Sequence, residues 1–333
     1  MSELLSAIEV SGLSKRYGKL LAVDNIDFHV KDGEIFGFMG PNGAGKTTTV
    51  MMLTSFLEPT AGTIRIHDYD LSVKSLEARA TMGIVPEESN IYTELTALDN
   101  LLFAGKIYRM SRKARKRRAE ELLEVFGLSD RANVKTQEFS KGMRRRLTVA
   151  MALIHEPKLL FLDEPISGLD VQSTRYIKKL VHDLNTSGVT IFLTTHQIEV
   201  ANELCNRVAI INQGRIATIG TPDELKANIE SVQTVAVTFD TPEGNNVPSL
   251  DGLKGVNHEI KSGNGRRLYT DSPADVIPAV IDFAREHGLR ITSLNTLGPS
   301  LEDVFLKITG QEVGTITTSP GGEGKRGKGG MRK

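Results

Sequence analysis

The feature that most constrains this chain is a glycine-rich loop between an apolar run and a helix-forming run. The apolar residues 34–39 lead into GPNGAGKT at 40–47, which matches the pattern G-x-x-x-x-G-K-[ST]. Glycines leave backbone N–H groups unobstructed, and the following helix turns the positive end of its dipole toward a bound anion. In such a loop Lys46 reaches the β- and γ-phosphates, and the Thr47 hydroxyl ligates Mg²⁺. The order strand, tight loop, helix therefore predicts an α/β fold that binds a nucleoside triphosphate.

Two further apolar runs end in residues that carry chemistry. LLFLDEP at 159–165 is typical of a buried parallel strand, and it delivers Asp163 and Glu164 at its end. An aspartate there can hold Mg²⁺ through its water shell, and the adjacent glutamate can take a proton from an attacking water. TIFLTTH at 190–196 repeats this form and ends at His196. The two acids, in a chain with a phosphate loop, predict hydrolysis of the nucleotide in addition to binding.

A fourth segment points to a family. FSKGM at 139–143 is followed by RRRLTVAMAL and begins 24 residues before Asp163. This segment resembles the signature motif of the nucleotide-binding subunits of ATP-binding cassette (ABC) transporters, and the resemblance covers roughly residues 5–225. It implies a P-loop NTPase ABC cassette, in which an α/β core with a mixed sheet carries an antiparallel β subdomain and a helical subdomain.

The resemblance also implies roles for individual residues. In the family, the signature of one subunit closes over ATP bound to a second subunit, so Ser140 and Gly142 would contact the γ-phosphate in trans. His196 matches the switch histidine, and Tyr17 matches the aromatic residue that stacks on adenine. The resemblance implies that ATP is bound by Tyr17, Gly40, Asn42, Gly43, Ala44, Gly45, Lys46, Thr47, Thr48, Ser140, Gly142 and Asp170. It implies Thr47, Asp163 and Glu87 as Mg²⁺ ligands. The implied catalytic residues are Glu164, His196 and Lys46.

Some positions depart from the family pattern. The loop that usually holds a glutamine has the sequence IVPEE at 84–88, with Glu87 at the glutamine position. Glu87 can still coordinate Mg²⁺, but its charge would repel phosphate, so we expect altered turnover. In the signature, Lys141 and Met143 replace the commoner glycine and glutamine.

The composition changes along the chain and predicts three parts. Residues 1–228 form the nucleotide-binding domain, with a helical insertion at about 95–155. Residues 229–311 contain patterns for strands, an amphipathic helix and a closing helix, and they predict a small α+β domain. The last part, 312–333, is rich in glycine and basic residues and is predicted to be disordered.

Composition also limits the class of function. The 41 Lys+Arg balance 41 Asp+Glu, and this argues against a nucleic-acid binder, which carries a clear basic excess. The single cysteine, Cys205, excludes an intramolecular disulfide and fits a reducing compartment. No apolar run approaches the roughly 18 residues that cross a bilayer, and the N-terminus lacks the pattern of a signal peptide. We therefore expect a cytoplasmic protein that reaches the membrane only through a partner.

Within the family, one set of motifs and a compact insertion favour a transporter ATPase over translation-associated and chromosome-maintenance proteins. The segments IYTELTALDNL at 91–101 and PSLEDVFLKITG at 299–310 resemble exporter ATPases of the daunorubicin-resistance type. This resemblance implies ATP and Mg²⁺ as cofactors, with a membrane permease and a second copy of the chain as partners. It also implies a place on the cytoplasmic face of the cell membrane. The alternative is a non-transport ABC ATPase that acts on a soluble macromolecular partner, of the translation or repair type.

Overall fold

The computed structural model describes residues 6–227, 233–240 and 247–310. The expected domain junction near Asn228 and the expected disordered tail at 312–333 lie outside the described residues. Among the helices of the described part, none is long and apolar enough to cross a membrane.

The chain first builds an antiparallel sheet with the strand order β2-β1-β4-β5. Its strands are β1 (Ser6–Tyr17), β2 (Leu20–Lys31), β4 (Ala61–Ile66) and β5 (Tyr69–Asp70). In β2, Ile26, Phe28 and Val30 are buried while the residues between them are exposed. This alternation is the pattern of a sheet with one face on the core and one face in solvent. It confirms the antiparallel β subdomain.

A mixed sheet forms the centre of the cassette, in the order β10-β9-β3-β8-β7-β6. Its strands are β3 (Ile35–Met39), β6 (Met82–Val85), β7 (Leu159–Asp163), β8 (Thr190–Thr195), β9 (Arg207–Asn212) and β10 (Arg215–Gly220), of which only β10 runs antiparallel to its neighbour. Strands β3 and β8 are buried along their whole length, as continuous apolar runs predict for parallel strands covered on both faces. Because parallel strands end at the same edge, the segments that follow β3, β7 and β8 lie together.

Five phenylalanines join the two sheets: Phe28 of β2, Phe36 and Phe38 of β3, Phe161 of β7 and Phe192 of β8. The centroids of neighbouring rings are 5.4 Å to 6.2 Å apart. Such aromatic pairs contribute about 0.5–1.5 kcal/mol each beyond the burial of their area. The cluster fixes the antiparallel sheet against the strands that carry the predicted site residues.

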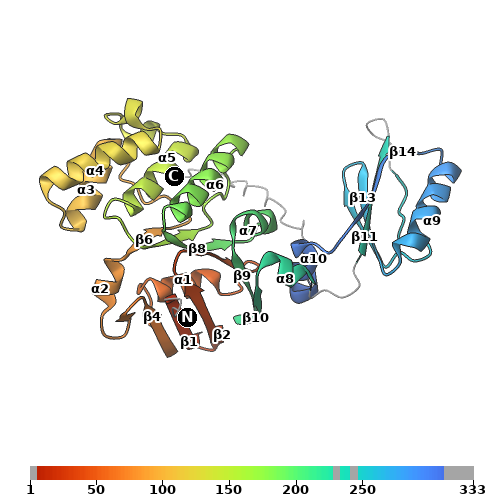
Figure 1. Ribbon diagram of the computed structural model, residues 1–333, viewed down its shortest axis with the longest axis horizontal. Coiled ribbons are helices and arrows are strands. Elements are labelled where there is room, and N and C mark those ends of the chain that lie inside the picture. The colour runs from red at the N-terminus through yellow and green to blue at the C-terminus, as the bar shows by residue number, and fades with distance from the viewer. Residues whose placement is uncertain (1–5, 228–232, 241–246, 311–333) are drawn as a thin grey trace, which may run out of the picture.

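Helices cover the mixed sheet, and three of them form a helical layer at one end of the cassette (Figure 1). That layer contains α3 (Ala97–Ile107), α4 (Arg112–Val125) and α5 (Lys141–Ala152), and it is the helical subdomain expected for the cassette fold. The remaining cassette helices are α1 (Lys46–Leu53), α2 (Ser75–Arg79), α6 (Val171–Thr186), α7 (Ile198–Leu204) and α8 (Pro222–Ala227), with short 3-10 turns at Ser129–Arg131 and Thr136–Glu138.

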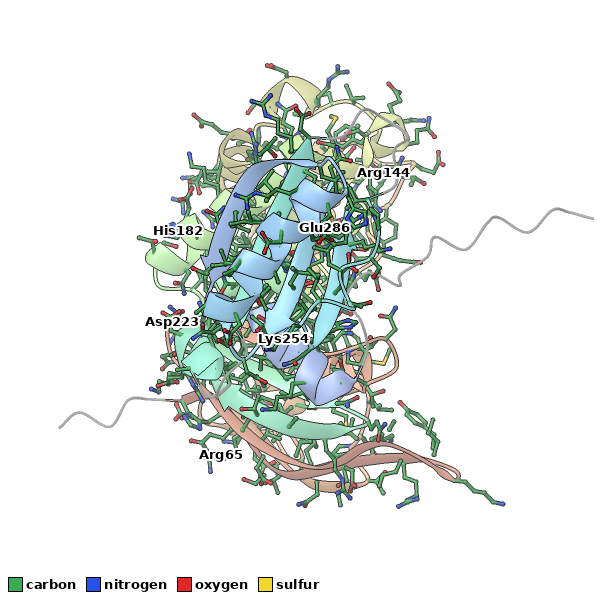
Figure 2. All side chains as sticks on the ribbon, turned by 90° about the vertical axis from the view of Figure 1, so that its right-hand side faces the viewer. Arg65, Arg144, His182, Asp223, Lys254 and Glu286 are labelled. Atoms are coloured by element: carbon green, nitrogen blue, oxygen red, sulfur yellow. The ribbon has the colours of Figure 1, made fainter. Side chains whose placement is uncertain are left out.

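The C-terminal part contains a second antiparallel sheet, in the order β12-β13-β11-β14. Its elements are β11 (Gln233–Asp240), β12 (His258–Ser262), β13 (Gly265–Thr270), α9 (Pro273–Glu286) and β14 (Arg290–Leu297). Helix α9 crosses the face of the sheet that is turned away from the cassette (Figures 1 and 2). Val276 and Val280 of α9 pack with Val235 and Phe239 of β11 in a core of their own.

The last helix returns to the cassette. Helix α10 (Leu301–Thr309) is the closing helix; it begins with a capping box between Ser300 and Asp303 and ends at Gly310 in the left-handed conformation. Its side chains Leu301, Val304 and Phe305 belong to the hydrophobic core of the cassette. On its other side, Glu302 pairs with Arg267 of β13. Helix α10 is therefore packed between the cassette and the C-terminal sheet.

Candidate nucleotide-binding and catalytic site

The phosphate loop lies between β3 and α1, as the sequence predicts. Gly43 and Gly45 have φ values of 80° and 109°, a conformation that side chains other than glycine rarely adopt. Gly40 has another reason to be glycine, because a Cβ there would collide with the main-chain oxygen of Ile211. The loop is thus a tight turn that lies directly before the first turn of α1.

Lys46 lies within the curve of this loop and is only 8% exposed. Its Nζ donates hydrogen bonds to the carbonyl oxygens of Gly40 at 2.7 Å and Pro41 at 3.1 Å. Burial lowers the pKa of Lys46, and the nearby carboxylates of Glu164, Asp163 and Glu87 oppose that change. The ammonium group therefore stands at the phosphate loop and faces the acidic residues.

The acidic pair follows β7 and is held by β8. The Thr194 hydroxyl donates to Asp163, while the main-chain N–H of Glu164 donates to the Thr194 hydroxyl at 3.0 Å. Glu164 is 7% exposed and has a φ of 45°, in the left-handed region. Its Oε2 is buried without a hydrogen-bond partner among the described residues. A buried carboxylate oxygen without a donor is placed to accept a proton or a hydrogen bond from a bound water.

His196 follows β8 and holds the other oxygen of this carboxylate. The Nδ1 of His196 lies 2.9 Å from Oε1 of Glu164. The hydrogen bond with Glu164 raises the pKa of His196, and partial burial opposes the rise. This favours a protonated His196 that donates to Glu164 and fixes the orientation of the carboxyl group.

A cavity of about 560 Å³ brings most of the predicted residues together. It is lined by Tyr17, Leu20, Ala22, Asn42, Gly43, Gly45, Lys46, Thr47, Thr48, Glu87, Asp163, Glu164, Ser167 and His196. Of the predicted site residues, Gly40 and Ala44 shape the loop without lining the cavity. Oxygen atoms from Thr47, Asp163 and Glu87 share this space, and oxygen donors of this kind fit Mg²⁺.

Three predicted residues do not line the cavity: Ser140 and Asp170, which are exposed, and Gly142, which is buried between them. Ser140 caps α5 by accepting from the N–H of Met143, and Asp170 caps α6 by accepting from the N–H of Ser173 at 2.8 Å. A Cβ on Gly142 would collide with the Ser173 hydroxyl, so α5 and α6 approach closely at their N-termini. We call Ser140, Gly142 and Asp170 the signature surface.

Known proteins match this arrangement along nearly the whole chain. Residues 23–167 match the family model for the ABC transporter, and residues 220–309 match that for the C-terminal domain of DrrA1-3-like ATP-binding proteins. The linearmycin resistance ATP-binding protein LnrL of Bacillus subtilis is 36% identical over 92% of this chain and 99% of its own length. The chain belongs to the ABC transporter ATP-binding proteins. The daunorubicin resistance ATP-binding protein DrrA3 of Streptomyces coeruleorubidus is 35% identical over 92% of this chain and 97% of its own length.

Solved structures of ABC cassettes agree. The ATP-binding subunit of an ABC transporter has 32% identity and a TM-score of 0.62, covering 67% of this chain and 92% of its own. A dimeric ATP-binding cassette in a post-hydrolysis state, bound to ADP and Pi, has 28% identity and a TM-score of 0.59, covering 64% and 98%. The P-loop NTPase ABC cassette fold predicted from the sequence is confirmed, and the chain is an ABC-type ATPase.

The structure adds residues to this ABC site that the sequence motifs did not indicate. Leu20 and Ala22 line the cavity near Tyr17. Arg145 of α5 is only 4% exposed and contacts the loops on which Glu87 and Glu164 lie. One sequence signal for Arg145 exists: it falls on the same helical stripe as the buried Gly142, Val149 and Ala152, where a charged residue needs a partner.

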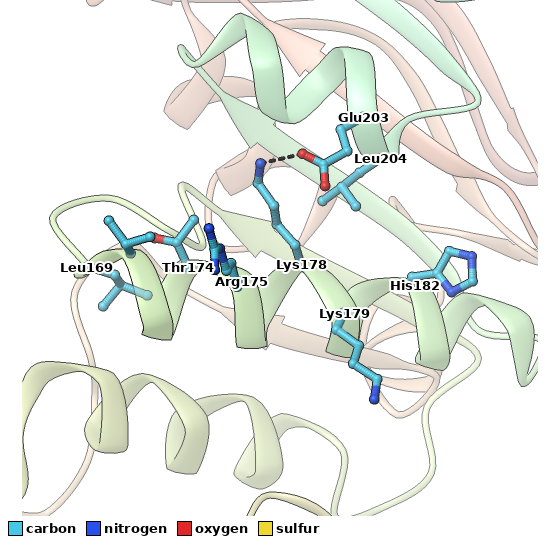
Figure 3. A pocket seen from close by; sticks show the side chains of 9 residues that line it. Leu169, Thr174, Arg175, Lys178, Lys179, His182, Glu203 and Leu204 are labelled. Carbon is cyan, nitrogen blue, oxygen red and sulfur yellow. Dashed lines mark hydrogen bonds and ion pairs between the residues drawn. The ribbon is translucent and has the colours of Figure 1, made fainter.

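A separate cavity of about 660 Å³ lies between α6 and α7 of the cassette (Figure 3). Arg175 and Lys179 of α6 border it, and Lys178 pairs with Glu203 of α7 across it. None of the predicted site residues lines this cavity. The smaller cavity at the phosphate loop is therefore the candidate site, because it holds the groups that nucleotide hydrolysis requires.

Proposed function

We propose that this chain is the ATP-hydrolysing subunit of an exporter whose permease is a separate membrane protein. The observation that carries the catalytic part is the cavity in which Lys46, Asp163, Glu164 and His196 meet. The relatives that match over nearly their whole length bear names of drug-resistance ATP-binding proteins and of a Nod factor export ATP-binding protein. An exporter subunit of this kind works on the cytoplasmic face of the cell membrane, where it meets ATP.

In the proposed mechanism, the N–H groups of the phosphate loop and the Lys46 ammonium bind the phosphates of ATP. The residues that would hold Mg²⁺ are Thr47, Asp163 and Glu87, and the ion would neutralise charge on the β- and γ-phosphates. Glu164 takes the proton of the attacking water through its unpartnered Oε2. His196 keeps Glu164 in place from the other side, and Tyr17 at the cavity rim stacks on adenine.

The signature surface completes the site of a second copy of the chain. Ser140 and Gly142 lie at the N-terminus of α5, where backbone N–H groups and the helix dipole favour an anion. They do not line the phosphate-loop cavity of their own chain, and the dimeric cassette among the structural relatives offers a precedent for pairing. Two copies related by a two-fold axis would place each signature surface over the γ-phosphate of the other copy.

An apolar surface of the helical layer suits the permease. Tyr92, Phe103 and Ile107 are exposed, and the rings of Tyr92 and Phe103 meet edge to face with centroids 4.9 Å apart. Exposed apolar groups gathered in this way mark interaction sites. Tyr92 follows Glu87 by five residues in the loop after β6, so a permease element docked here would act on the cavity through that loop.

The test uses the full-length chain and the membrane protein captured with it from detergent extracts of its own cells. After both are reconstituted in vesicles, we expect the permease to stimulate ATP hydrolysis, and Glu164→Gln to lower hydrolysis by about a hundredfold or more and transport with it. Glu199→Gln, an exposed change on α7, is the matched control and should leave both unchanged. Capture with ribosomes or DNA-bound complexes, together with full ATPase activity in the absence of a membrane partner, would instead support the soluble-partner alternative.

A further inference from the structure

Arg145 lies in α5, which we call the signature helix because it begins at the signature surface. Its side chain reaches two loops of the catalytic site, the loop that carries Glu164 and the loop that carries Glu87. The Arg145 guanidinium donates to the carbonyl oxygen of Pro165 at 2.9 Å and to that of Asp163 at 2.8 Å. It also donates to the carbonyl oxygen of Glu87 at 3.2 Å and to that of Pro86. A planar guanidinium with five N–H donors in fixed directions can hold several carbonyl groups at once, which a lysine cannot do.

Two of these carbonyl groups flank Glu164 in the chain. Glu164 adopts a left-handed conformation, which costs about 1–2 kcal/mol for a residue with a side chain and persists only when its surroundings impose it. Arg145 holds the peptide before Glu164 and the residue after it. The N–H of Glu164 donates to the Thr194 hydroxyl. These bonds together fix the backbone that presents the Glu164 carboxylate.

The other two carbonyl groups belong to the loop after β6. This loop carries Glu87, which lines the cavity, and it leads to the apolar surface of Tyr92 and Phe103. Arg145 itself lies in α5, which begins at the signature surface. One buried side chain thus connects the signature helix, the loop of Glu87 and the backbone around Glu164.

Burial of the Arg145 charge costs free energy, and this favours a specific role for the residue. Burial lowers the pKa of Arg145 to about 10, so the guanidinium stays charged at neutral pH. A buried charge is tolerated when hydrogen bonds satisfy it, and here main-chain oxygens do so while the carboxylates of Asp163 and Glu87 lie nearby. An apolar residue would fill the same space without joining these loops.

We propose that Arg145 is a positioning residue for ATP hydrolysis: it holds Glu164 in the conformation that activates water and couples the loop of Glu87 to the signature helix. The inference rests on the proposed role of Glu164 as general base. The conservative change Arg145→Lys keeps the charge but removes the planar group that bonds to both loops. We expect kcat to fall by about 10- to 100-fold, since a small misplacement of a catalytic group has effects of this size. The KM for MgATP should change less than about threefold, because the phosphate loop is untouched.

Two neighbours serve as matched controls. Arg144 and Arg146 lie in the same helix, and their guanidinium groups bond to the carbonyl oxygens of Phe139 and Phe126 outside the cavity. Arg144→Lys and Arg146→Lys should leave kcat within about twofold of the unchanged chain. Equal losses in all three variants, or a normal kcat in Arg145→Lys, would overturn the proposal.

Two further measurements separate positioning from loss of folding. In Arg145→Ala, added guanidinium ion at millimolar concentration should restore part of kcat, whereas Arg144→Ala should gain nothing. In a Glu164→Gln background, Arg145→Lys should lower kcat little further, because both changes remove the same function. A full additional loss there would refute action through Glu164. Normal hydrolysis in Glu164→Gln alone would refute the general base itself, and the two failures are therefore distinct.

Discussion

His196 Nδ1 lies 2.9 Å from Glu164 Oε1, while the second oxygen of that carboxylate is buried without a partner in the described part of the chain. The two oxygens of Glu164 are therefore unlike. One is anchored by the imidazole, and the other is left to accept from water. This asymmetry suits a general base, because it leaves one carboxylate oxygen free to accept a hydrogen bond or a proton.

Glu164→Gln should lower kcat for ATP hydrolysis by about a hundredfold or more, because an amide cannot take the proton from water. The affinity for ATP should persist, since Lys46 and the phosphate loop remain. Steady-state hydrolysis and equilibrium binding of ATP measure the two effects. Glu199→Gln is the control, and a wild-type rate in Glu164→Gln would show that another group activates the water.

His196→Ala should also slow hydrolysis, by about tenfold or more, because the Glu164 carboxylate loses its anchor. The double variant with Glu164→Gln should be little slower than Glu164→Gln alone, as expected for two residues that act as one unit. Comparison of kcat in the four proteins of this cycle measures the coupling. Independent, additive losses would separate the roles of the two residues.

Glu87→Gln should lower the KM for MgATP a few-fold, because it removes one negative charge from a cavity built for phosphates. The adjacent Glu88 is also exposed and does not line the cavity, so Glu88→Gln is a matched control. Initial rates at varied MgATP measure the change. A higher KM in Glu87→Gln would instead show that the negative charge of Glu87 contributes more to Mg²⁺ binding than it costs in repulsion of phosphate.

Ser140→Arg should prevent pairing of two copies in the presence of ATP, because a bulky cation would occupy the N-terminus of α5 where the γ-phosphate of the partner belongs. Light scattering with Glu164→Gln and ATP measures the molecular mass when hydrolysis is blocked. We expect a dimer with Ser140 and a monomer with arginine at that position. Ser129→Arg, on an exposed 3-10 turn of the same layer, is the control and should still dimerise.

The stability of the cassette should fall in mild acid because of His155. Burial lowers its pKa from the usual 6.5 to about 4, its ring stacks on Tyr108, and its Nδ1 is buried without a partner in the described part of the chain. Between these pH values the unfolded chain binds the proton more readily than the folded one, so stability is complete above pH 6.5 and is lost as pH falls toward 4. At about 1.4 kcal/mol per pKa unit, the loss reaches about 3 kcal/mol.

Urea unfolding at a series of pH values tests this effect. His155→Gln should flatten the dependence of unfolding free energy on pH across that window. His182→Gln, a change at an exposed position of α6, should leave the dependence as it is. An unchanged slope in His155→Gln would assign the acid sensitivity to other groups.

The sequence could indicate that the candidate site residues lie together, because each of them follows an apolar strand. Lys46, Glu164 and His196 come after β3, β7 and β8, and parallel strands end at a common edge. The spatial order β3-β8-β7 differs from the chain order, and only the structure shows that Thr194 stands between the acidic pair and β3. The motif pattern does not indicate that Thr194 bonds to Asp163 and Glu164.

Sequence patterns alone do not indicate the contacts that Arg145 and α10 make. The bonds of Arg145 join residues 20 and 58 positions away, and this depends on how α5 packs beside the mixed sheet. The caps of α10 could be predicted from Ser300 and Gly310, because capping is local. The apolar face of α10 packs into the cassette core, and this contact joins residues that are far apart in the sequence, so the local pattern does not predict it.

Because α10 packs against the cassette, the hydrophobic core of the cassette is incomplete without this helix. Leu301, Val304 and Phe305 fill part of the cassette core, and Asn212 of β9 donates to the carbonyl oxygen of Ile308. A shortened protein ending after α8 would leave an apolar socket open to water, at a cost on the order of 5 kcal/mol for three such side chains. The turn after Asn212 also contacts the phosphate loop, because the N–H of Gly214 donates to the carbonyl oxygen of Ala44 at 3.0 Å. The C-terminal helix thus links the C-terminal sheet to the end of β9, next to the turn that bonds to the phosphate loop.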